Sequence, residues 1–507
     1  MTFEIVFVLL SLLGMMAALI ADKMRPGMVL FSVVVLFLCV GILTPKEMLE
    51  GFSNKGMITV ALLFLVSEGI RQSGTLGQVI KKLLPQGKTT VFKAQLRILP
   101  SVAFISAFLN NTPVVVIFAP IIKHWAKSVK LPATKFLIPL SYVTILGGIC
   151  TLIGTSTNLV VHGMILEAGY EGFTMFELGK VGIFIAIAGI IYLFIFSKRL
   201  LPDARPDTAV PDEEVEEGEK LHRVEAVLGA RFPGINKKLS DFNFQRHYGA
   251  EVKEIKTRNG QRYVDHLEDV VLREGDTLVV MADDTFIPTW GESSVFVLLT
   301  NGNDPDTSGK KKRWLALILL VLMIVGATVG ELPATKEMFP DIKLDMFFFV
   351  CITTIIMAWT NIFPARKYTK YISWDILITI ACAFAISKAM VNSGVADCVA
   401  GFIIGLSDDY GPHVLLAILF VITNLFTELI TNNAAAALAF PLALSISAQL
   451  GVSPTPFFVV ICMAASASFS TPIGYQTNLI VQGIGNYKFT DFVRIGLPLN
   501  IITFLIS

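Results

Sequence analysis

Two short polar stretches interrupt two of the most apolar parts of the chain. Residues 110–112 read Asn-Asn-Thr inside the apolar run 93–125, and residues 431–433 read Thr-Asn-Asn inside the run 412–450. Three adjacent polar groups at membrane depth must be satisfied by protein, water or a ligand. Amides and hydroxyls can donate to an anion, and their oxygens can hold a hard cation such as sodium. Each stretch is therefore a candidate tip of a re-entrant hairpin; a kinked span is the alternative.

A second motif occurs once in each half of the chain. Residues 153–163 and 473–483 are identical at seven of eleven positions, at a constant offset of 320 from Ile153 to Ile473. An offset of 321 relates Asn111 to Asn432 at the tips. Broken helices at matched positions of an inverted repeat are typical of secondary transporters, which bind substrate and ions near the bilayer midplane. We predict one repeated module, with a transport site where the two tips meet the two Gly-x-x-Thr-Asn breaks.

Two hydroxyls and one acid lie close to the tips. Ser106 and Thr427 are related by the offset of 321 and precede their tips by about one helical turn. Each can add an oxygen to an ion site, although such hydroxyls also bond back to helix carbonyls. Glu428 is the only acid beside a tip. An intramembrane carboxylate is a functional candidate: it can bind a cation, carry a proton for coupling, or pair with a buried donor.

Composition excludes several classes of protein. Of the 507 residues, 54% are hydrophobic and only 16% charged, against about 25% charged in soluble domains. A net charge of +1 gives no reason to expect a nucleic-acid partner. The six cysteines form no close Cys-x-x-Cys pair, which argues against a metal site or disulfide framework. Because the chain has neither a phosphate-binding Gly-rich loop nor a nucleophile with a paired base, we predict no enzyme activity and no cofactor.

The long apolar segments predict an all-α polytopic membrane protein, since about 20 apolar residues span a bilayer as a helix. The N-terminus lacks the basic start of a secretory signal, so residues 3–21 are expected to be a retained span. The apolar segments lie near 3–21, 27–44, 56–72, 93–125, 135–166, 178–197, 313–330, 344–361, 374–392, 412–450, 455–485 and 491–507.

Basic residues gather in alternate loops. Placing the Lys- and Arg-rich loops near 71–97, 123–135, 198–199 and 310–313 in the cytoplasm puts the more acidic loops outside. The alternation of basic and acidic loops holds only if each interrupted segment enters and leaves the membrane on the same side. This favours hairpins over kinked spans. The first half then starts outside and the second inside, so the two halves are predicted to be inverted.

Between the halves lies a soluble insert. The chain is predicted to divide into a first transmembrane repeat (1–200), a linker and cytoplasmic α+β domain (203–308), and a second repeat (310–507). The expected elements of the domain are strands at 224–228, 250–256 and 262–264, a strand ending at Met281, a short helix starting at Leu239, and an Asn-Gly turn at 259–260.

The tips and breaks resemble those of the divalent anion–sodium symporter family, the dicarboxylate and sulfate carriers within the ion transporter superfamily. The resemblance covers nearly all of residues 1–200 and 310–507. Members carry Ser-Asn-Thr at both tips, and this chain keeps the central asparagine as Asn111 and Asn432. The resemblance implies a sodium-coupled symporter that works by alternating access in the cell membrane, as a homodimer, with sodium ions as co-transported ligands.

The resemblance also implies the site residues. In the family, each sodium site combines the tip asparagine, a hydroxyl four residues before the tip and a backbone carbonyl of the facing break. The implied sodium ligands are Ser106, Asn111 and Gly154 for one ion, and Thr427, Asn432 and Gly474 for the other. The implied substrate contacts are Asn111, Thr112, Thr155, Asn432, Asn433 and Gln476.

The breaks depart from the family pattern. Dicarboxylate carriers often read Ser-Pro-Pro-Asn or Thr-Pro-Pro-Asn there, whereas this chain reads Thr-Ser-Thr-Asn at 155–158 and Tyr-Gln-Thr-Asn at 475–478. The additional hydroxyls and amides favour a compact oxyanion such as sulfate. Without an obvious arginine, uncharged donors and sodium would have to offset the desolvation of the anion. Dicarboxylate symport, anion exchange, oxyanion efflux and a channel regulated by the insert stay open as alternatives.

The insert has a resemblance of its own. Residues 220–300 are similar to the C-terminal module of potassium-conductance regulators, the TrkA-C type, through Gly-Ala-Arg-Phe-Pro-Gly at 229–234 and Leu-Arg-Glu-Gly-Asp at 272–276. Such modules are regulatory, and some bind small ligands. The resemblance implies a small-molecule regulator of unidentified chemistry; an inert cytoplasmic insert is the alternative.

Overall fold

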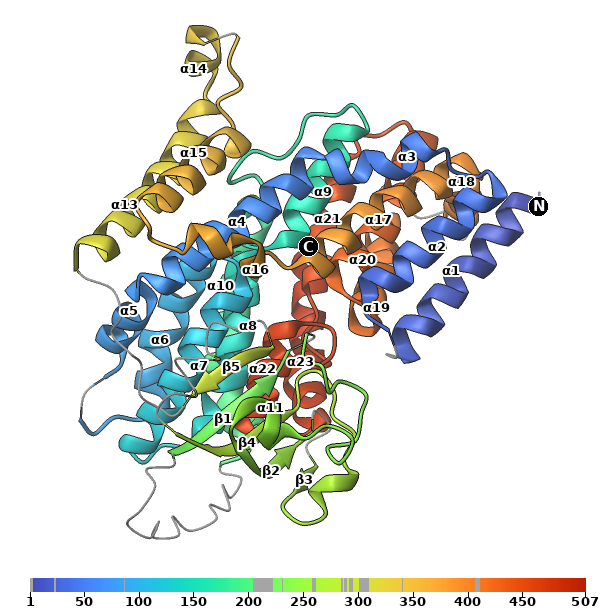
Figure 1. Ribbon diagram of the computed structural model, residues 1–507. Helices are drawn as coiled ribbons and strands as arrows, with labels where there is room; N and C mark the ends of the chain where they lie inside the picture. Colours follow the sequence, from blue (N-terminus) through green and yellow to red (C-terminus); the bar gives the residue numbers. More distant parts are fainter. Residues whose placement is uncertain are drawn as a thin grey trace, which may run out of the picture.

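The computed structural model is a bundle of helices with a small sheet at one end (Figure 1). Within the described chain, eight helices are long and apolar enough to cross a membrane. The predicted fold class, an all-α polytopic membrane protein with a small α+β insert, is confirmed. The structure describes residues 3–21, 24–85, 87–203, 222–229, 231–257, 261–283, 286, 290, 295–300, 310–339, 341–405 and 411–507.

The two halves place their helices at matched positions. α7 begins at Asn111 and α20 at Asn432, at the offset of 321, while α9 begins at Ser156 and α22 at Gln476, at the offset of 320. The helices of the first half are α4 (Lys55–Gln72), α5 (Thr75–Leu83), α6 (Val91–Ser106), α7 (Asn111–Ser128), α8 (Leu137–Gly148), α9 (Ser156–Glu167) and α10 (Gly179–Leu200). Those of the second are α17 (Trp374–Asn392), α18 (Val395–Gly405), α19 (Pro412–Leu429), α20 (Asn432–Leu450), α21 (Thr455–Ser466), α22 (Gln476–Gly485) and α23 (Phe489–Ile506).

Both interrupted segments end and restart at the predicted residues. α6 ends at Ser106 before α7 begins at Asn111, and α19 ends at Leu429 before α20 begins at Asn432. The two helices of each pair contact each other, as the legs of a hairpin do. The predicted interruptions are therefore confirmed, while the opposite orientation of the two halves in the membrane stays a prediction.

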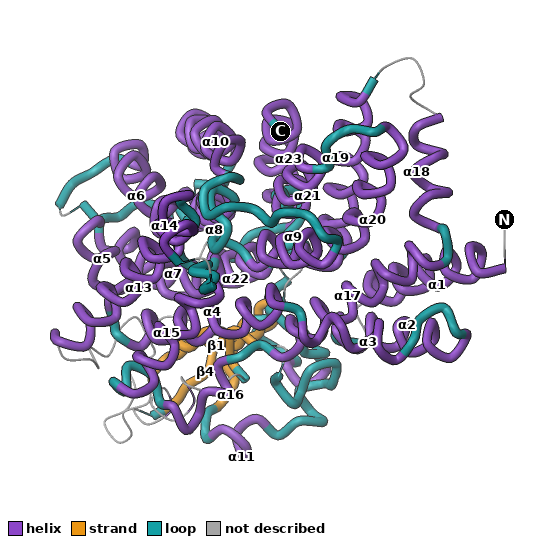
Figure 2. Tube along the Cα trace, turned by 90° about the horizontal axis from the view of Figure 1, so that it is seen from above, coloured by secondary structure: helices purple, strands orange, loops and turns teal. Residues whose placement is uncertain are grey.

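The outer helices of each half pack against the other half. α2 packs on α17, and α15 packs on α4, so that each half closes over its counterpart (Figure 2). The inner helices do the same: α7 packs against α22, and α20 against α9. The outer elements are α1 (Phe3–Ala21), α2 (Pro26–Val40), α3 (Pro45–Glu50), η1 (Gly51–Ser53), α13 (Lys310–Gly330), α14 (Pro333–Met338), α15 (Met346–Trp359), η4 (Ala365–Lys367) and α16 (Tyr368–Tyr371). A further turn, η2 (Ala133–Lys135), precedes α8.

The insert is a five-stranded antiparallel sheet in the order β3-β2-β4-β1-β5. Alternate residues of a strand face opposite sides of its sheet, and β1 uses both sides. Val224 and Leu228 face the aromatic core of the insert, whereas Val227 packs into the core of the membrane helices. The elements are β1 (His222–Leu228), α11 (Phe244–Tyr248), β2 (Glu251–Lys256), β3 (Arg262–Tyr263), η3 (Leu267–Asp269), β4 (Thr277–Ala282) and β5 (Phe296–Thr300).

Four strands of the insert follow the prediction, but the fifth, β5, was not predicted, and the helix does not start where it was expected. The prediction of a helix starting at Leu239 is wrong, because the backbone there pairs with another segment: the Leu239 amide donates to the Val270 carbonyl. The helix starts at Phe244, where the Asn243 side chain accepts from the Arg246 amide and caps the first turn. The expected Asn-Gly turn at 259–260 and the acidic linker at 212–217 lie outside the described residues.

Candidate transport site

An asparagine side chain at equivalent positions stabilises the unwound backbone of each break. The Asn158 amide donates to the carbonyls of Gly148 (3.3 Å) and Thr151 (2.9 Å). In the second half, the Asn478 amide donates to the carbonyls of Ser468 (2.8 Å) and Thr471 (3.2 Å). All three positions are related by the offset of 320. Because unwound backbone inside a membrane protein needs such partners, the asparagine of each Gly-x-x-Thr-Asn motif has a structural role.

Oxygen atoms converge around Asn111 at the first tip. Ser106 Oγ lies 2.9 Å from Asn111 Oδ1. The same end of the Asn111 side chain lies 3.1 Å from the Thr144 carbonyl oxygen and 3.2 Å from that of Gly154. A nitrogen at this position would donate to all three groups. The hydrogen bonds are satisfied with the nitrogen at this end and with the Asn111 oxygen accepting from the Tyr475 hydroxyl (2.5 Å). Turning the amide over would bring four oxygens together, a ligand set suited to a hard cation.

The second tip repeats this arrangement around Asn432. Thr427 Oγ lies 2.9 Å from Asn432 Oδ1 and donates to the Ala465 carbonyl at 2.6 Å. Ala465 corresponds to Thr144 at the offset of 321. Gly474 packs directly against Thr427, since a Cβ added at Gly474 would lie 2.6 Å from the Thr427 carbonyl oxygen. Every residue implied as a sodium ligand thus lies in one of two matched clusters. The Thr144 and Ala465 carbonyls were not predicted, because a backbone oxygen leaves no signal in the side-chain sequence.

The residues implied as substrate contacts bridge the two halves in reciprocal pairs. Thr112 Oγ of the first tip donates to Gln476 Oε1 of the second break (3.3 Å). Ser156 Oγ of the first break donates to Asn433 Oδ1 of the second tip (3.3 Å). Thr112 corresponds to Asn433, and Gln476 to Ser156, so the two contacts are equivalent. A cleft lined by Asn110, Ser156, Phe108, Ile153, Leu159 and residues of α4 opens beside this interface.

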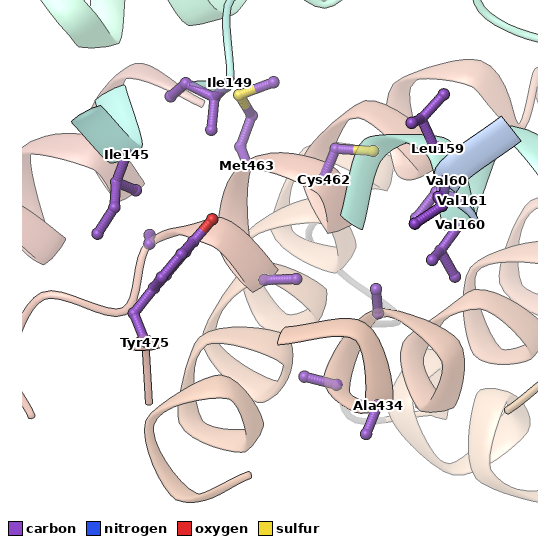
Figure 3. Packing of buried hydrophobic residues seen from close by; sticks show 14 of the residues in the cluster. Val60, Ile145, Ile149, Leu159, Val160, Val161, Ala434, Cys462, Met463 and Tyr475 are labelled. Carbon is purple, nitrogen blue, oxygen red and sulfur yellow. The ribbon is translucent and has the colours of Figure 1, made fainter. Parts of the chain in front are cut away.

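One residue at the centre was missed in the predicted site. The Tyr475 hydroxyl lies 3.0 Å from Thr155 Oγ, contacts Asn111 and is close to the Asn432 side chain. Its ring belongs to the buried apolar cluster that includes Ile145 of α8 and Met463 of α21 (Figure 3). The signal in the sequence is that Tyr475 and Thr155 are one of the four pairs that differ within the repeated motif.

Glu428 is directed away from the tip asparagines. Its Oε1 accepts hydrogen bonds from the Ser470 amide and the Asn500 side chain, both at 2.8 Å. The Thr471 hydroxyl donates to its backbone carbonyl at 3.2 Å. Of the three roles considered for this carboxylate, these contacts agree with pairing to buried donors. The equivalent residue of the first half is Ala107, so the arrangement occurs in one half alone.

The insert contacts a helix from each half. Lys123 of α7 forms an ion pair with Glu225 of β1 (3.0 Å), and Lys256 of β2 lies 3.4 Å from the same carboxylate. Burial would raise the pKa of Glu225, but the two lysines outweigh it and lower the pKa to about 2. On the other side, Gly483 of α22 packs against Thr277 of β4. The sheet therefore touches α7 and α22, whose N-termini carry site residues.

Bundled apolar helices, matched polar tips and unwound breaks together define a multi-pass membrane transporter. A family model described as CitMHS, citrate transporter, matches residues 16–451 and, in a second match, residues 338–507. The chain belongs to this family, which confirms the predicted relationship to anion–sodium carriers. It is a transporter rather than an enzyme.

Named relatives agree with this assignment. An uncharacterized transporter of Synechocystis is 29% identical, covering 93% of this chain and 90% of the relative. A putative sulfur deprivation response regulator of Chlamydomonas reinhardtii is 28% identical, covering 94% of this chain and 96% of the relative. Sodium/sulfate cotransporter 2 of the same alga is 30% identical over 56% of this chain and 32% of its own length.

Proposed function

We propose that the protein is a sodium-coupled symporter that takes up a compact divalent oxyanion, with sulfate favoured, by alternating access. The observation that carries the proposal is the matched pair of oxygen clusters around Asn111 and Asn432. Each cluster joins a tip amide, a hydroxyl and a carbonyl of the facing helix. Carbonyls and helix ends at such breaks bind the coupling ion in transporters of this architecture.

Helix termini supply the attraction for an anion. α7, α9, α20 and α22 begin at Asn111, Ser156, Asn432 and Gln476, the residues that meet between the halves. A helix N-terminus carries unpaired amides and the positive end of the helix dipole, so it favours a negative charge. None of the predicted site residues is a lysine or arginine. Two sodium ions would therefore add the fixed positive charge that a divalent anion requires.

Citrate or a dicarboxylate is the second candidate substrate. The family model is described as a citrate transporter, and some relatives are named sodium/sulfate cotransporters. The hydroxyls and amides at the breaks support sulfate. Competition against labelled sulfate by thiosulfate, succinate, citrate and arsenite would separate the candidates.

Other parts of the proposal rest on sequence pattern and resemblance. The distribution of basic loops supports inverted halves and a cytoplasmic insert, and the reciprocal packing of α2 on α17 and α15 on α4 agrees with a two-fold relation. A homodimer in the cell membrane and a small-molecule regulator of the insert follow from the family resemblances. Light scattering of the purified protein would measure the number of copies in the assembly.

The test is uptake of labelled sulfate into proteoliposomes with and without an inward sodium gradient. We expect uptake to require the gradient, and Asn111→Ala and Asn432→Ala each to abolish it. Asn392→Ala is the matched control, because Asn392 also donates to the other half, at the Ile42 carbonyl (3.1 Å), but lies outside the site. Uptake that does not depend on the sodium gradient would reject the symporter. Normal transport by both tip variants would show that the transport site lies outside the two tips.

A further inference from the structure

At Tyr475 the two halves place side chains of very different size at the centre of the site. Its counterpart at the offset of 320 is Thr155, and the two hydroxyls touch each other at 3.0 Å. The Tyr475 hydroxyl also contacts Asn111 and Asn432, the central asparagines of both tips. The residue is 8% exposed. A single phenol therefore joins both tips and one break.

The ring and the hydroxyl contribute different properties. The ring is rigid and belongs, like Ile145 and Met463, to the buried apolar cluster (Figure 3), so it fills space that a threonine-sized residue leaves open. The hydroxyl donates one hydrogen bond and accepts others without carrying a charge at neutral pH. An anion that reaches the tips can therefore receive the hydrogen that this hydroxyl otherwise shares with Thr155 or Asn111.

We propose that Tyr475 determines substrate selectivity, its ring limiting the site to a compact oxyanion and its hydroxyl acting as an uncharged donor to that anion. This inference rests on the proposed function. The oxygens of sulfate surround one sulfur atom, so its donors must converge on one point. A dicarboxylate or citrate separates its carboxylates by several carbons and needs room between two sets of donors. The Tyr475 ring takes up that room between the tips.

Two variants separate the two contributions. Tyr475→Thr makes the second break match the first at this position. We expect succinate or citrate, if they do not compete with labelled sulfate in the wild type, to compete in this variant. Tyr475→Phe keeps the ring and removes the donor. We expect it to exclude succinate still, with the half-saturating sulfate concentration raised roughly 10- to 100-fold, the effect of losing a hydrogen bond to a charged group.

Tyr487→Phe is the matched control. Tyr487 is fully buried and donates to the Thr134 carbonyl at 2.5 Å, so the variant also loses a buried tyrosyl hydrogen bond, but away from the tips. Neither its selectivity nor its sulfate affinity should change. Should Tyr475→Thr fail to fold, Tyr475→Leu opens part of the same space with an apolar side chain, and partial competition by succinate is expected.

The outcomes distinguish this inference from the proposed function. Sulfate uptake by the wild type, together with continued exclusion of succinate by Tyr475→Thr and Tyr475→Leu, would overturn the role of the ring. An unchanged sulfate affinity in Tyr475→Phe would overturn the role of the hydroxyl. A wild-type protein that takes up no sulfate would instead reject the proposed substrate. Sodium-dependent stabilisation against heat, measured on each purified variant, reports directly whether the ion clusters remain formed.

Discussion

The first and second breaks use identical residues to hold their backbone and different residues to line the space between them. Asn158 and Asn478 bond carbonyls at equivalent positions. In contrast, Thr155 faces Tyr475, and the reciprocal bridges to the tips are made by Ser156 and Gln476. Positions that agree between the halves shape the backbone and the proposed ion clusters. Positions that differ surround the place where the anion is proposed to bind, and a substrate without the symmetry of the repeat requires such differences.

Substitutions at positions that the two breaks share are expected to have the largest effect, which is on the sodium requirement. In Gly474→Ala, the new Cβ would lie 1.9 Å from Ser468 Oγ and 2.6 Å from the Thr427 carbonyl oxygen. Overpacking of this kind costs about 1–3 kcal/mol, so we expect the half-saturating sodium concentration to rise roughly 10- to 100-fold. Gly154→Ala should act similarly, because its Cβ would lie 2.4 Å from the Gly148 carbonyl oxygen.

Sodium dependence of sulfate uptake measures this effect, and Gly401→Ala is the control. A Cβ at Gly401 meets nothing closer than 3.8 Å. If the variant of one half changed the sodium requirement and that of the other half did not, the two clusters would not be equivalent.

A smaller effect is expected at a position that differs. Gln476→Ser gives the second break the serine of the first and removes the side chain that Thr112 contacts. We expect the half-saturating sulfate concentration to rise about three- to tenfold, the effect of one lost neutral hydrogen bond, while the sodium requirement stays unchanged. Parallel titrations of sulfate and sodium provide the measurement. An equal change in both would contradict the assignment of shared positions to ions and differing positions to the anion.

The insert contacts α7 through an ion pair and α22 through close packing. Variants at these contacts are expected to have the smallest effect on transport. Glu225→Gln removes the charge that pairs with Lys123 and Lys256. The Cβ of Thr277 lies 3.8 Å from a Cβ added at Gly483, a suitable spacing for a disulfide. With cysteines at both positions and the native cysteines replaced, we expect Glu225→Gln to lower the yield of this cross-link. Glu251→Gln, which breaks the exposed pair with Lys253, is the control.

The same ion pair predicts the pH dependence of docking. The folded-state pKa of Glu225 is lowered from 4.5 to about 2. Its ionised form therefore stabilises docking fully above a pH of about 4.5, and this contribution is lost as the pH falls through 2. Because thiol oxidation itself stops in acid, the distance between spin labels at residues 277 and 483, compared at neutral pH and near pH 3, would measure the loss, and a distance independent of pH over this range would contradict it.

Much of this architecture could be predicted because it leaves a pattern in side chains. The repeated motif, the polar tips and the hydroxyls of Ser106 and Thr427 appear in the sequence at fixed offsets. The carbonyls of Thr144 and Ala465 leave no such pattern, since any residue supplies a carbonyl. The role of Tyr475 could not be predicted from its own repeat, because it depends on contacts with tips more than 40 and 360 residues away, to Asn432 and Asn111. In the insert, long-range backbone pairing at Leu239 overrode a local helical pattern.

The exchange of outer helices between the halves also constrains the order in which the protein can assemble. α2 ends at Val40, and its partner α17 begins at Trp374. At a synthesis rate of about 5–20 residues per second, the roughly 330 residues between them take on the order of 15–70 s to appear. For that time only lipid and its neighbours α1 and α3 cover the apolar face of α2, and the insert is made before α17. During biogenesis the first half therefore stays incompletely packed until α17, which is synthesised after the insert, packs against α2.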